Sequence, residues 1–505
     1  MPIPLQFNFY PRAREDRLSA SQEALHQPRK EFLKAAFVNF LLLQIVFFSL
    51  FCYLYGSLYQ QNTHIHNISI VYVDYDGGII GQSVRDASHT LQSRGFPTLI
   101  ERSPVEFPSP VDIRSAVCNI HFWAAVYTAH GASSRLATAL AANDTATVST
   151  FNRSDVLFYI WNEARYPTVV DSVIASNIQN LSSTARAVYT RESSSSVLAV
   201  LRSAEALNLF ANPWETVSIN IQRTAQGSRL IYNTIAVILI FVQEFCFLGI
   251  VNGLYTQFRL YSRLFPSRVI MVRIILSALY TLSGSFFSTV AVWAFRHGWH
   301  VNANQFVLSW FTLWLFAHLN FLTLDFFTVW LPAFYTPLAL ISWAILNIAS
   351  ILIPYELNPG FFRWSYVLPA HSLYMTQIDV WSRGCNPQLW YTLPTMFTIE
   401  ITSLTLSSIG VYRRCHYAKV IEEDEEKTLQ MRMAAQTPPQ AVPQPEQEEG
   451  LVPPMPTRTA TRTPTRQPTQ EDVDKDNETL ERLRRRSSNV YYGPSFSLVR
   501  SPTNV

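Results

Sequence analysis

Three acidic residues lie inside long apolar stretches of the chain: Glu244, Asp325 and Glu400. A charged group at membrane depth costs a few kcal/mol, so such residues usually face a cavity, a partner or a path for protons. Their natural partners are one another, when protonated, or Arg273 at the start of another apolar stretch. The three acids are therefore the first candidates for a functional site.

Simpler interpretations of these residues stay open. Glu244 and Asp325 are placed toward the ends of their stretches that we expect to face the cytosol, where a carboxylate could reach water. His318 lies about two turns before Asp325, and a lone histidine of this kind is typical of a packed or hydrogen-bonded helix residue. Glu400 is nearer the middle of its apolar stretch. Of the three acids, it is therefore the one least expected to reach water.

The sequence lacks the motifs of several other chemistries. It has no phosphate-binding GxxxxGK[ST] loop, no HExxH metal motif and no GxSxG nucleophile motif. His64 and His66 form a lone HxH pair, and the five cysteines show no CxxC spacing. Asp74 and Asp76 before two glycines could suggest a metal site, but a strand end followed by a turn is the favoured interpretation. We expect no enzyme, no metal site and no cofactor.

The composition indicates a membrane protein. The 505 residues are 48% hydrophobic and 15% charged, whereas soluble proteins carry about a quarter charged residues. The net charge of +3 is small and spread along the chain, so it gives no argument for a nucleic-acid partner. Six apolar stretches are long enough to cross a bilayer. They span residues 35–55, 231–251, 270–295, 306–330, 334–354 and 393–411.

Flanking charges orient these six predicted transmembrane helices. Basic residues are concentrated in residues 1–34, which places the N-terminus in the cytosol and makes residues 35–55 a signal anchor. The connection after the second helix carries four arginines and no acid, and basic residues also follow the sixth. Both chain ends are therefore predicted to be cytosolic, and the polar insertion of residues 56–229 extracytoplasmic.

Glycosylation sequons support this placement of the insertion. They occur at Asn67, Asn143, Asn152 and Asn180, and such acceptors are useful only outside the cytosol. None of the five lysines lies between the first apolar stretch and the last. Chance is the alternative for the sequons, since a further match at Asn477 falls where we predict cytosol.

Alternating patterns predict an α/β domain within the insertion. We expect strands over residues 68–75, 96–100, 122–127, 156–161 and 214–221. The expected helices cover residues 82–93, 111–120 and 133–142, with a longer helical region over 164–210 that Pro167 interrupts.

Two further segments belong to the membrane-proximal and cytosolic parts. Residues 355–391 are rich in aromatic residues and predict a segment lying in the membrane interface. Cys385 falls there, on the same side of the membrane as Cys118. A disulfide between the two cysteines and two unpaired thiols are both open alternatives.

Residues 413–505 are predicted to be a disordered cytosolic tail. Its Ser487 and Ser488, beside a basic cluster, could be phosphorylated, although a simple solvated basic tail is the plainer reading.

The layout resembles the fungal nitrosoguanidine-resistance membrane proteins. The resemblance covers roughly Phe32 to Arg414 and is carried by the opening Val71-Tyr72-Val73-Asp74-Tyr75-Asp76-Gly77-Gly78 and by Trp364-Ser365-Tyr366-Val367-Leu368-Pro369 before the last helix. The membrane plan is also similar to that of phage-infection-type proteins and of type-2 ABC exporter membrane subunits. The resemblance implies export of, or tolerance to, toxic small molecules at the plasma membrane, whereas the sequons alone fit any membrane of the secretory pathway. It transfers no site residues.

We expect a transporter or resistance factor for small amphiphilic molecules, with the three intramembrane acids as its candidate translocation path. A homodimer is expected only by analogy with type-2 exporters. The alternative is a scaffold or regulator of membrane lipid organisation, which does not transport and acts through its ectodomain and tail. The absence of a nucleotide-hydrolysing motif favours that alternative, whereas the acids favour transport.

Overall fold

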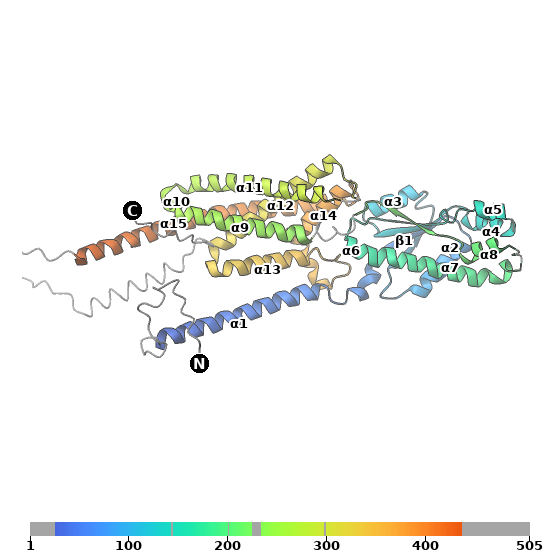
Figure 1. Cartoon of the computed structure of the whole chain (residues 1–505), viewed down its shortest axis with the longest axis horizontal. Helices are drawn as coiled ribbons and strands as arrows, with labels where there is room; N and C mark the ends of the chain where they lie inside the picture. The colour runs from blue at the N-terminus through green and yellow to red at the C-terminus, as the bar shows by residue number, and fades with distance from the viewer. Residues whose placement is uncertain are drawn as a thin grey trace, which may run out of the picture. The chain divides into compact units, whose positions relative to one another are not determined.

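The computed structural model describes residues 26–142, 145–199, 201, 203–224, 234–296 and 299–436 (Figure 1). The described chain is mostly helical and contains one small mixed sheet. It divides after Tyr59 into two compact units. The first holds helix α1 (His26–Ser57), and the second holds all other described elements. Asn143, Ser487 and Ser488 lie outside the described residues.

Helix α1 is apolar over most of its length and is long enough to span a bilayer. Its large side chains are exposed on every side, for example Phe37, Ile45 and Phe48. A helix that is hydrophobic all round needs an apolar surrounding. This is the behaviour expected of the predicted signal anchor.

The sheet has five strands in the order β2-β1-β3-β4-β5. Their bounds are β1 Ser69–Asp74, β2 Thr98–Arg102, β3 Ala124–Thr128, β4 Leu157–Trp161 and β5 Thr216–Asn220. All pairs are parallel except β3 with β4, which is antiparallel. Every predicted strand is therefore confirmed within a few residues. Strands β1 and β3 are almost wholly buried, which is typical of parallel strands covered on both faces.

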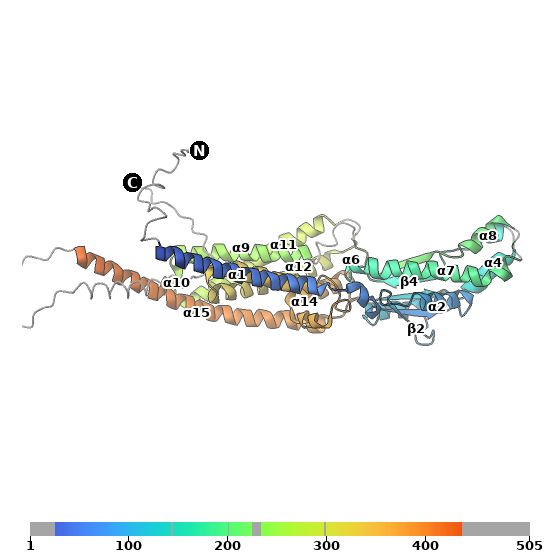
Figure 2. The same ribbon diagram turned by 90° about the horizontal axis from the view of Figure 1, so that it is seen from below.

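Helices cover both faces of this sheet. Helix α3 (Pro110–Cys118) packs against one face, and Ile113 and Val117 join β1 and β3 in a hydrophobic core. Helix α2 (Ile79–Leu91) packs with the long α7 (Ser176–Val197), as Figures 1 and 2 show. Helices α4 (Ala132–Ala142), α5 (Thr145–Thr150) and α8 (Ala204–Ala211) contact one another beside the sheet. The helical region after Pro167 begins as α6 (Pro167–Val170) and a π-helical turn, Asp171–Ala175.

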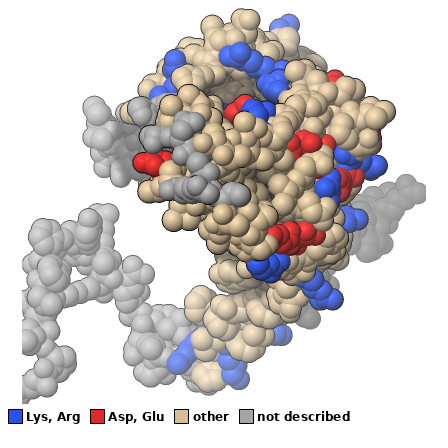
Figure 3. Space-filling view, turned by 90° about the vertical axis from the view of Figure 1, so that its right-hand side faces the viewer, with Lys and Arg blue, Asp and Glu red and all other residues tan. Residues whose placement is uncertain are grey.

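The charged side chains visible in Figure 3 are mixed in sign. Among the described residues on this face, Lys and Arg are interspersed with Asp and Glu and do not gather into one continuous patch. This face therefore offers no extended surface for a strongly charged polymer.

The Asp-Tyr-Asp-Gly-Gly segment forms a closed turn at the carboxyl ends of β1 and β3. Asp74 Oδ1 accepts hydrogen bonds from the backbone N–H groups of Asp76 and Gly77, and its Oδ2 lies 2.7 Å from Arg85. Asp76 accepts a hydrogen bond from the backbone N–H of Ser133 at the start of α4. Parallel sheets often bind ligands at this edge, but here the carboxylates of the chain itself occupy it. The hydrogen bonds that Asp74 accepts from the N–H groups of Asp76 and Gly77 agree with the strand end and turn that the sequence predicts.

We predict that Gly81→Ala destabilises the α/β domain. A Cβ at Gly81 would overlap the Asp74 carboxylate, so this buried group would have to leave its partners. Overpacking of this kind costs about 1–3 kcal/mol, which would show as a lower thermal midpoint of the purified protein. Gly95→Ala is the matched control, because a Cβ there would meet only Asn62 O at 3.9 Å. Equal midpoints for the two variants would contradict the close packing at Gly81.

The remaining long helices form a bundle. They are α9 (Ala236–Gln257), α11 (Pro266–Ala294), α12 (Ala303–Trp330), α13 (Thr336–Ala349), α14 (Pro369–Trp381) and α15 (Leu389–Gln436). Helix α12 contacts α9, α11, α14 and α15, so it is central to the bundle (Figures 1 and 2). The short α10 (Leu260–Arg263) connects α9 to α11.

Four described helices are long and apolar enough to cross a membrane: α1, α9, α11 and α12. Two of the six predicted spans differ from this pattern. Helix α13 is apolar but has only 14 residues. Helix α15 is long but carries Glu400 and many Thr and Ser residues, several of which donate hydrogen bonds to carbonyls one turn earlier. Such local bonding satisfies the hydroxyls but leaves the helix less apolar than the other spans.

The prediction of a disordered tail from residue 413 onward is wrong for its first part, because α15 continues without a break to Gln436. Good helix formers dominate this extension, and Lys419 pairs with Glu422 at 3.0 Å. Arg259 on the connection before α10 lies 3.6 Å from Glu425. The extension is therefore a charged helix that the composition alone did not reveal.

The aromatic stretch of residues 355–391 has both exposed and buried parts. A 3-10 helix, Gly360–Val367, exposes Phe361 and Trp364. Helix α14 is instead buried on nearly every side, including Tyr374 and Trp381. Only the exposed part has the surface expected of a segment lying in the membrane interface.

Candidate functional site: a buried polar stripe between helices

Asp325 on α12 is buried between two arginines from neighbouring helices. Its Oδ1 lies 2.7 Å from Arg273 Nη2 on α11 and 3.0 Å from Arg414 Nη2 on α15. Ser407 donates a hydrogen bond to the other carboxylate oxygen. Asp325 is 1% exposed, so it does not reach water at the helix end. Two positive charges facing one negative charge leave the cluster with a net charge of +1.

Asn252 and Tyr261 hold both arginines in place. Arg273 Nη1 donates to Asn252 Oδ1 at 3.0 Å and to the Tyr261 hydroxyl at 2.9 Å. Arg414 Nη1 donates to the same two oxygens at 3.1 Å and 3.2 Å. Helices α9, α10, α11, α12 and α15 thus meet at a single hydrogen-bonded centre. Guanidinium groups with a carboxylate and several hydrogen-bond acceptors around them can remain charged while buried, although Arg414 Nε makes no hydrogen bond.

A second polar group lies about two helical turns away along α12, at His318. His318 Nδ1 lies 2.5 Å from Glu400 Oε1 on α15, and His318 Nε2 lies 3.2 Å from Ser277 Oγ on α11. The two titratable side chains are largely buried, at 12% and 16% exposed. The second oxygen of Glu400, Oε2, is buried without a hydrogen-bond partner. A carboxylate and an imidazole in contact can exchange a proton and so switch between a charged and a neutral pair.

A small cavity separates the two polar groups. It measures about 10 Å³ and is lined by Arg273, Ser277, Asp325 and Ser407 among others. This is about the space that one water molecule needs, and the polar lining supplies partners for it. Glu400, His318, Ser277 and Asp325 therefore lie along one nearly continuous polar stripe.

The stripe approaches a larger cavity at its other end. That cavity measures about 260 Å³ and is lined by Tyr261, Tyr255, Arg259 and Glu422, among others. Tyr261 belongs both to this lining and to the arginine cluster. Tyr255, whose ring centre lies 5.4 Å from the Arg273 guanidinium carbon, belongs to the same lining. Both tyrosines therefore lie between the buried charges and a space large enough for several waters.

Glu244 is not part of the stripe. It is fully buried on α9, and neither carboxylate oxygen has a hydrogen-bond partner. The structure therefore brings Asp325 and Glu400 into one polar region through α12 but leaves the third acid apart. An isolated buried carboxyl group is most stable in the protonated form.

Sequence reasoning named Arg273 as a partner for the acids but missed Arg414, Asn252 and Tyr261. The spacing of polar residues along the helices could have indicated Arg414. Glu400, Ser407 and Arg414 follow at intervals of seven residues on α15, and so do His318 and Asp325 on α12. Residues seven apart lie on one face of a helix, so polar groups at this interval predict a shared polar stripe.

The α/β domain is fastened to the bundle through a separate set of contacts. Cys118 at the end of α3 forms a disulfide with Cys385, which follows α14. Asn162 donates a hydrogen bond to the Cys385 carbonyl, and Tyr374 on α14 accepts one from the backbone N–H of Tyr166. A covalent bond and several hydrogen bonds therefore join the domain to the segment around α14.

A buried arginine lies close to this junction. Arg165 is 5% exposed and stacks over the ring of Trp123, with 3.8 Å from its guanidinium carbon to the ring centre. Trp123 in turn donates a hydrogen bond to Glu356 after α13. Burial lowers the pKa of Arg165 to about 10, and the charge of Glu356 acts in the opposite direction. Arg165 thus remains charged at neutral pH.

The described sequon residues differ in accessibility. Asn152 and Asn180 are exposed on the α/β domain, and Asn180 lies on α7. Asn67 is also exposed, but its amide donates a hydrogen bond to the Glu356 carbonyl at 2.9 Å. Asn152 and Asn180 are therefore the more accessible acceptors in the folded domain.

Comparison with known proteins agrees with this architecture. Apolar helices of spanning length, with a polar α/β domain inserted between them, define a multi-pass membrane protein. The chain belongs to the family described as "Protein of unknown function (DUF3533)", whose model matches residues 39–404. It is 23% identical over 392 residues to the uncharacterized endoplasmic reticulum membrane protein YJR015W of Saccharomyces cerevisiae, covering 69% of this chain and 73% of the relative. No solved structure matches.

Proposed function

We propose that the protein exports small amphiphilic molecules from the cytosolic side of a secretory-pathway membrane, driven by proton movement through the polar stripe. The observation that carries this proposal is the contact of His318 with Glu400 and Ser277 inside the helix bundle. Protonation of such a pair changes the charge that the surrounding helices must accommodate, so it can bias the bundle between two conformations. The Asp325 cluster would form the fixed part of the stripe.

The proposed orientation has six spans with α13 and α15 included, both chain ends in the cytosol, and the α/β domain outside it. Arg259 and Arg263 between α9 and α11, together with Arg268 in the first turn of α11, support it, because positive charge favours the cytosolic side. The disulfide supports it too, since disulfides persist in oxidising compartments. Glycans at Asn152 and Asn180 would fit the same placement.

The endoplasmic reticulum is the membrane that we propose first, because the yeast relative is named as a protein of that membrane. The plasma membrane follows from the resemblance to the nitrosoguanidine-resistance proteins and is the second choice. Both membranes expose the α/β domain to an oxidising space, so the orientation does not depend on the choice.

We expect Glu400→Gln to slow export strongly without loss of the protein. Glutamine keeps the shape and can still bond to His318, but it cannot take up or release the proton. Cells that lack the chain and express either form would be loaded with a fluorescent amphiphile, and its efflux followed over time. We expect efflux to fall by about tenfold or more, the usual scale for loss of a proton-transfer group.

Glu423→Gln is the control for this experiment, because it removes an exposed acid from the same helix α15. Efflux by this variant should equal that of the wild type. Equal efflux by the Glu400→Gln variant at normal membrane abundance would refute the proton-driven mechanism.

The rival function is a scaffold or regulator of membrane lipid organisation. The observation that favours it is the covalent fastening of the α/β domain to the bundle, which suits a fixed platform better than a moving gate. Deletion of the chain separates the two proposals. Unchanged accumulation of the amphiphile together with an altered lipid distribution would favour the scaffold.

A further inference from the structure

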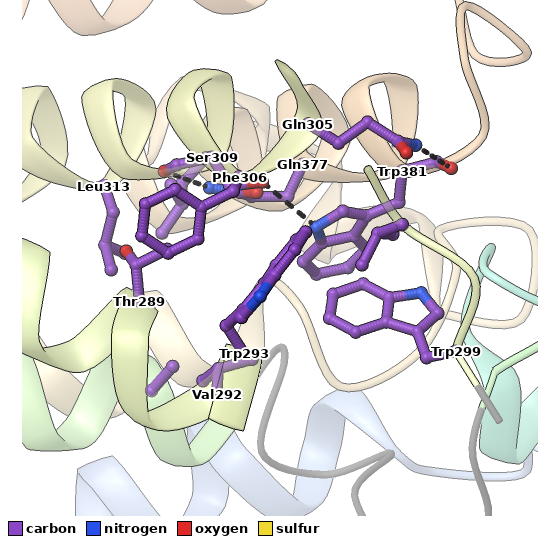
Figure 4. A pocket seen from close by; sticks show the side chains of 13 residues that line it. Thr289, Val292, Trp293, Trp299, Gln305, Phe306, Ser309, Leu313, Gln377 and Trp381 are labelled. Carbon is purple, nitrogen blue, oxygen red and sulfur yellow. Dashed lines mark hydrogen bonds between the residues drawn. The ribbon is translucent and has the colours of Figure 1, made fainter. Parts of the chain in front are cut away.

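A pocket with aromatic walls lies where α11, α12 and α14 meet, away from the polar stripe (Figure 4). The indole rings of Trp293, Trp299 and Trp381 surround it in Figure 4, and Phe306 lies across from them. Trp299 and Trp381 are each 6% exposed. Interfacial tryptophans usually point at lipid headgroups, whereas these two are directed into the protein.

Most polar atoms of this pocket are already bound within the protein. Gln305 Nε2 donates to the carbonyls of Val380 and Trp381 at 3.0 Å and 2.8 Å. Trp381 Nε1 donates to Ser309 Oγ at 3.2 Å, as the dashed line in Figure 4 shows. These hydrogen bonds hold the lining side chains in place, so the pocket has a defined shape.

Gln377 brings a buried acceptor without a hydrogen-bond partner to the lining. Gln377 on α14 donates from Nε2 to the Ser309 carbonyl at 3.0 Å, but its Oε1 is buried and makes no hydrogen bond. The residue is 5% exposed. A buried acceptor without a partner costs roughly 1–3 kcal/mol, which a ligand carrying a hydrogen-bond donor would recover.

The charges near the pocket favour a ligand whose hydrogen-bond donor is neutral. Arg296 stacks on the ring of Trp293, with 3.9 Å from its guanidinium carbon to the ring centre. That ring face is therefore already occupied by a cation, and a second cation would be repelled. Among the described residues that line the pocket, none is acidic. A hydroxyl or amide N–H group satisfies Gln377 Oε1 without adding charge.

The size of the pocket limits what enters it. Its free volume is about 50 Å³, well below the several hundred Å³ that a whole drug-sized ligand needs. Trp293 and Phe306 are partly exposed and mark the open side. Only the polar end of a molecule would fit inside, while its apolar body would lie outside along the helices.

We propose that this pocket binds the hydroxyl-bearing end of a neutral, membrane-resident amphiphile through Gln377 Oε1. The assignment names a substrate class for the proposed export and rests on that function for its role. Binding itself is measured without transport. Failure of binding and failure of export are therefore distinguishable.

The test uses the purified full-length protein in lipid nanodiscs and a long-chain alcohol that carries a photoreactive diazirine in its chain. Labelled peptides should map to α11, α12 and α14. Unlabelled hexadecan-1-ol should compete about tenfold better than its methyl ether, because the ether keeps the apolar body but lacks the donor.

Gln377→Leu should abolish this preference, so that the alcohol and the ether compete equally. The comparison of two competitors on one variant holds even if the variant weakens binding of the apolar body. Gln179→Leu, the same change at an exposed position on α7, should keep the tenfold preference. Even labelling of the lipid-facing helix surfaces, or equal competition by both compounds on the wild type, would overturn the proposal.

Discussion

Asp325→Asn is expected to cause the largest loss of stability of any single substitution in the bundle. The change removes the one negative charge that faces Arg273 and Arg414, both of which are at most 5% exposed. Two buried guanidinium groups would then repel each other without a counterion. Breaking a buried ion pair in this way costs about 3–5 kcal/mol. We expect little folded protein after detergent extraction and a much lower thermal midpoint of what remains.

Arg414→Met provides the informative comparison. It leaves Arg273 and Asp325 as a neutral pair, so the net charge of the cluster falls from +1 to zero. The variant loses hydrogen bonds to Thr328 and Asn252 but leaves no buried charge without a partner of opposite sign. We therefore expect a smaller loss of stability than for Asp325→Asn. A larger loss would show that packing around Arg414, and not charge balance, governs this centre.

Cys385→Ser is expected to loosen the α/β domain from the bundle. The disulfide with Cys118 joins residues 267 positions apart, and loss of a native disulfide typically costs about 2–5 kcal/mol. Either single substitution removes the whole bridge, so the Cys118→Ser, Cys385→Ser and double variants should have the same thermal midpoint. Limited proteolysis should also cut between the domain and the helices sooner than in the wild type.

Peptide mapping after alkylation without reduction checks the bridge directly. The peptides that contain Cys118 and Cys385 should be recovered as one linked species from protein made in cells. Cys246→Ser is the control, because Cys246 is an exposed free cysteine and its loss should change neither the link nor the midpoint. Recovery of Cys118 and Cys385 as separate alkylated peptides would contradict both the bridge and the extracytoplasmic placement that it supports.

Local patterns predicted the α/β domain well because strands and short helices depend on nearby residues. The alternation before Asp74 and the glycines after Asp76 set the end of β1, and the buried core at Val71 and Ile113 agrees with it. The same reasoning failed at the end of α15. Low hydrophobicity after residue 420 indicated disorder, but charged residues with good helix propensity, once attached to a long helix, extend it at little cost.

The candidate site shows the opposite balance. Sequence alone determined which side chains are unusual: three acids and a histidine within apolar helices, where each carries a cost that needs a partner. Only the tertiary structure decided the partners. It placed Asp325 between Arg273 and Arg414, set His318 against Glu400, and left Glu244 apart. These pairings join residues 52 to 89 positions apart, and contacts at such separations depend on how whole helices pack, which no local pattern encodes.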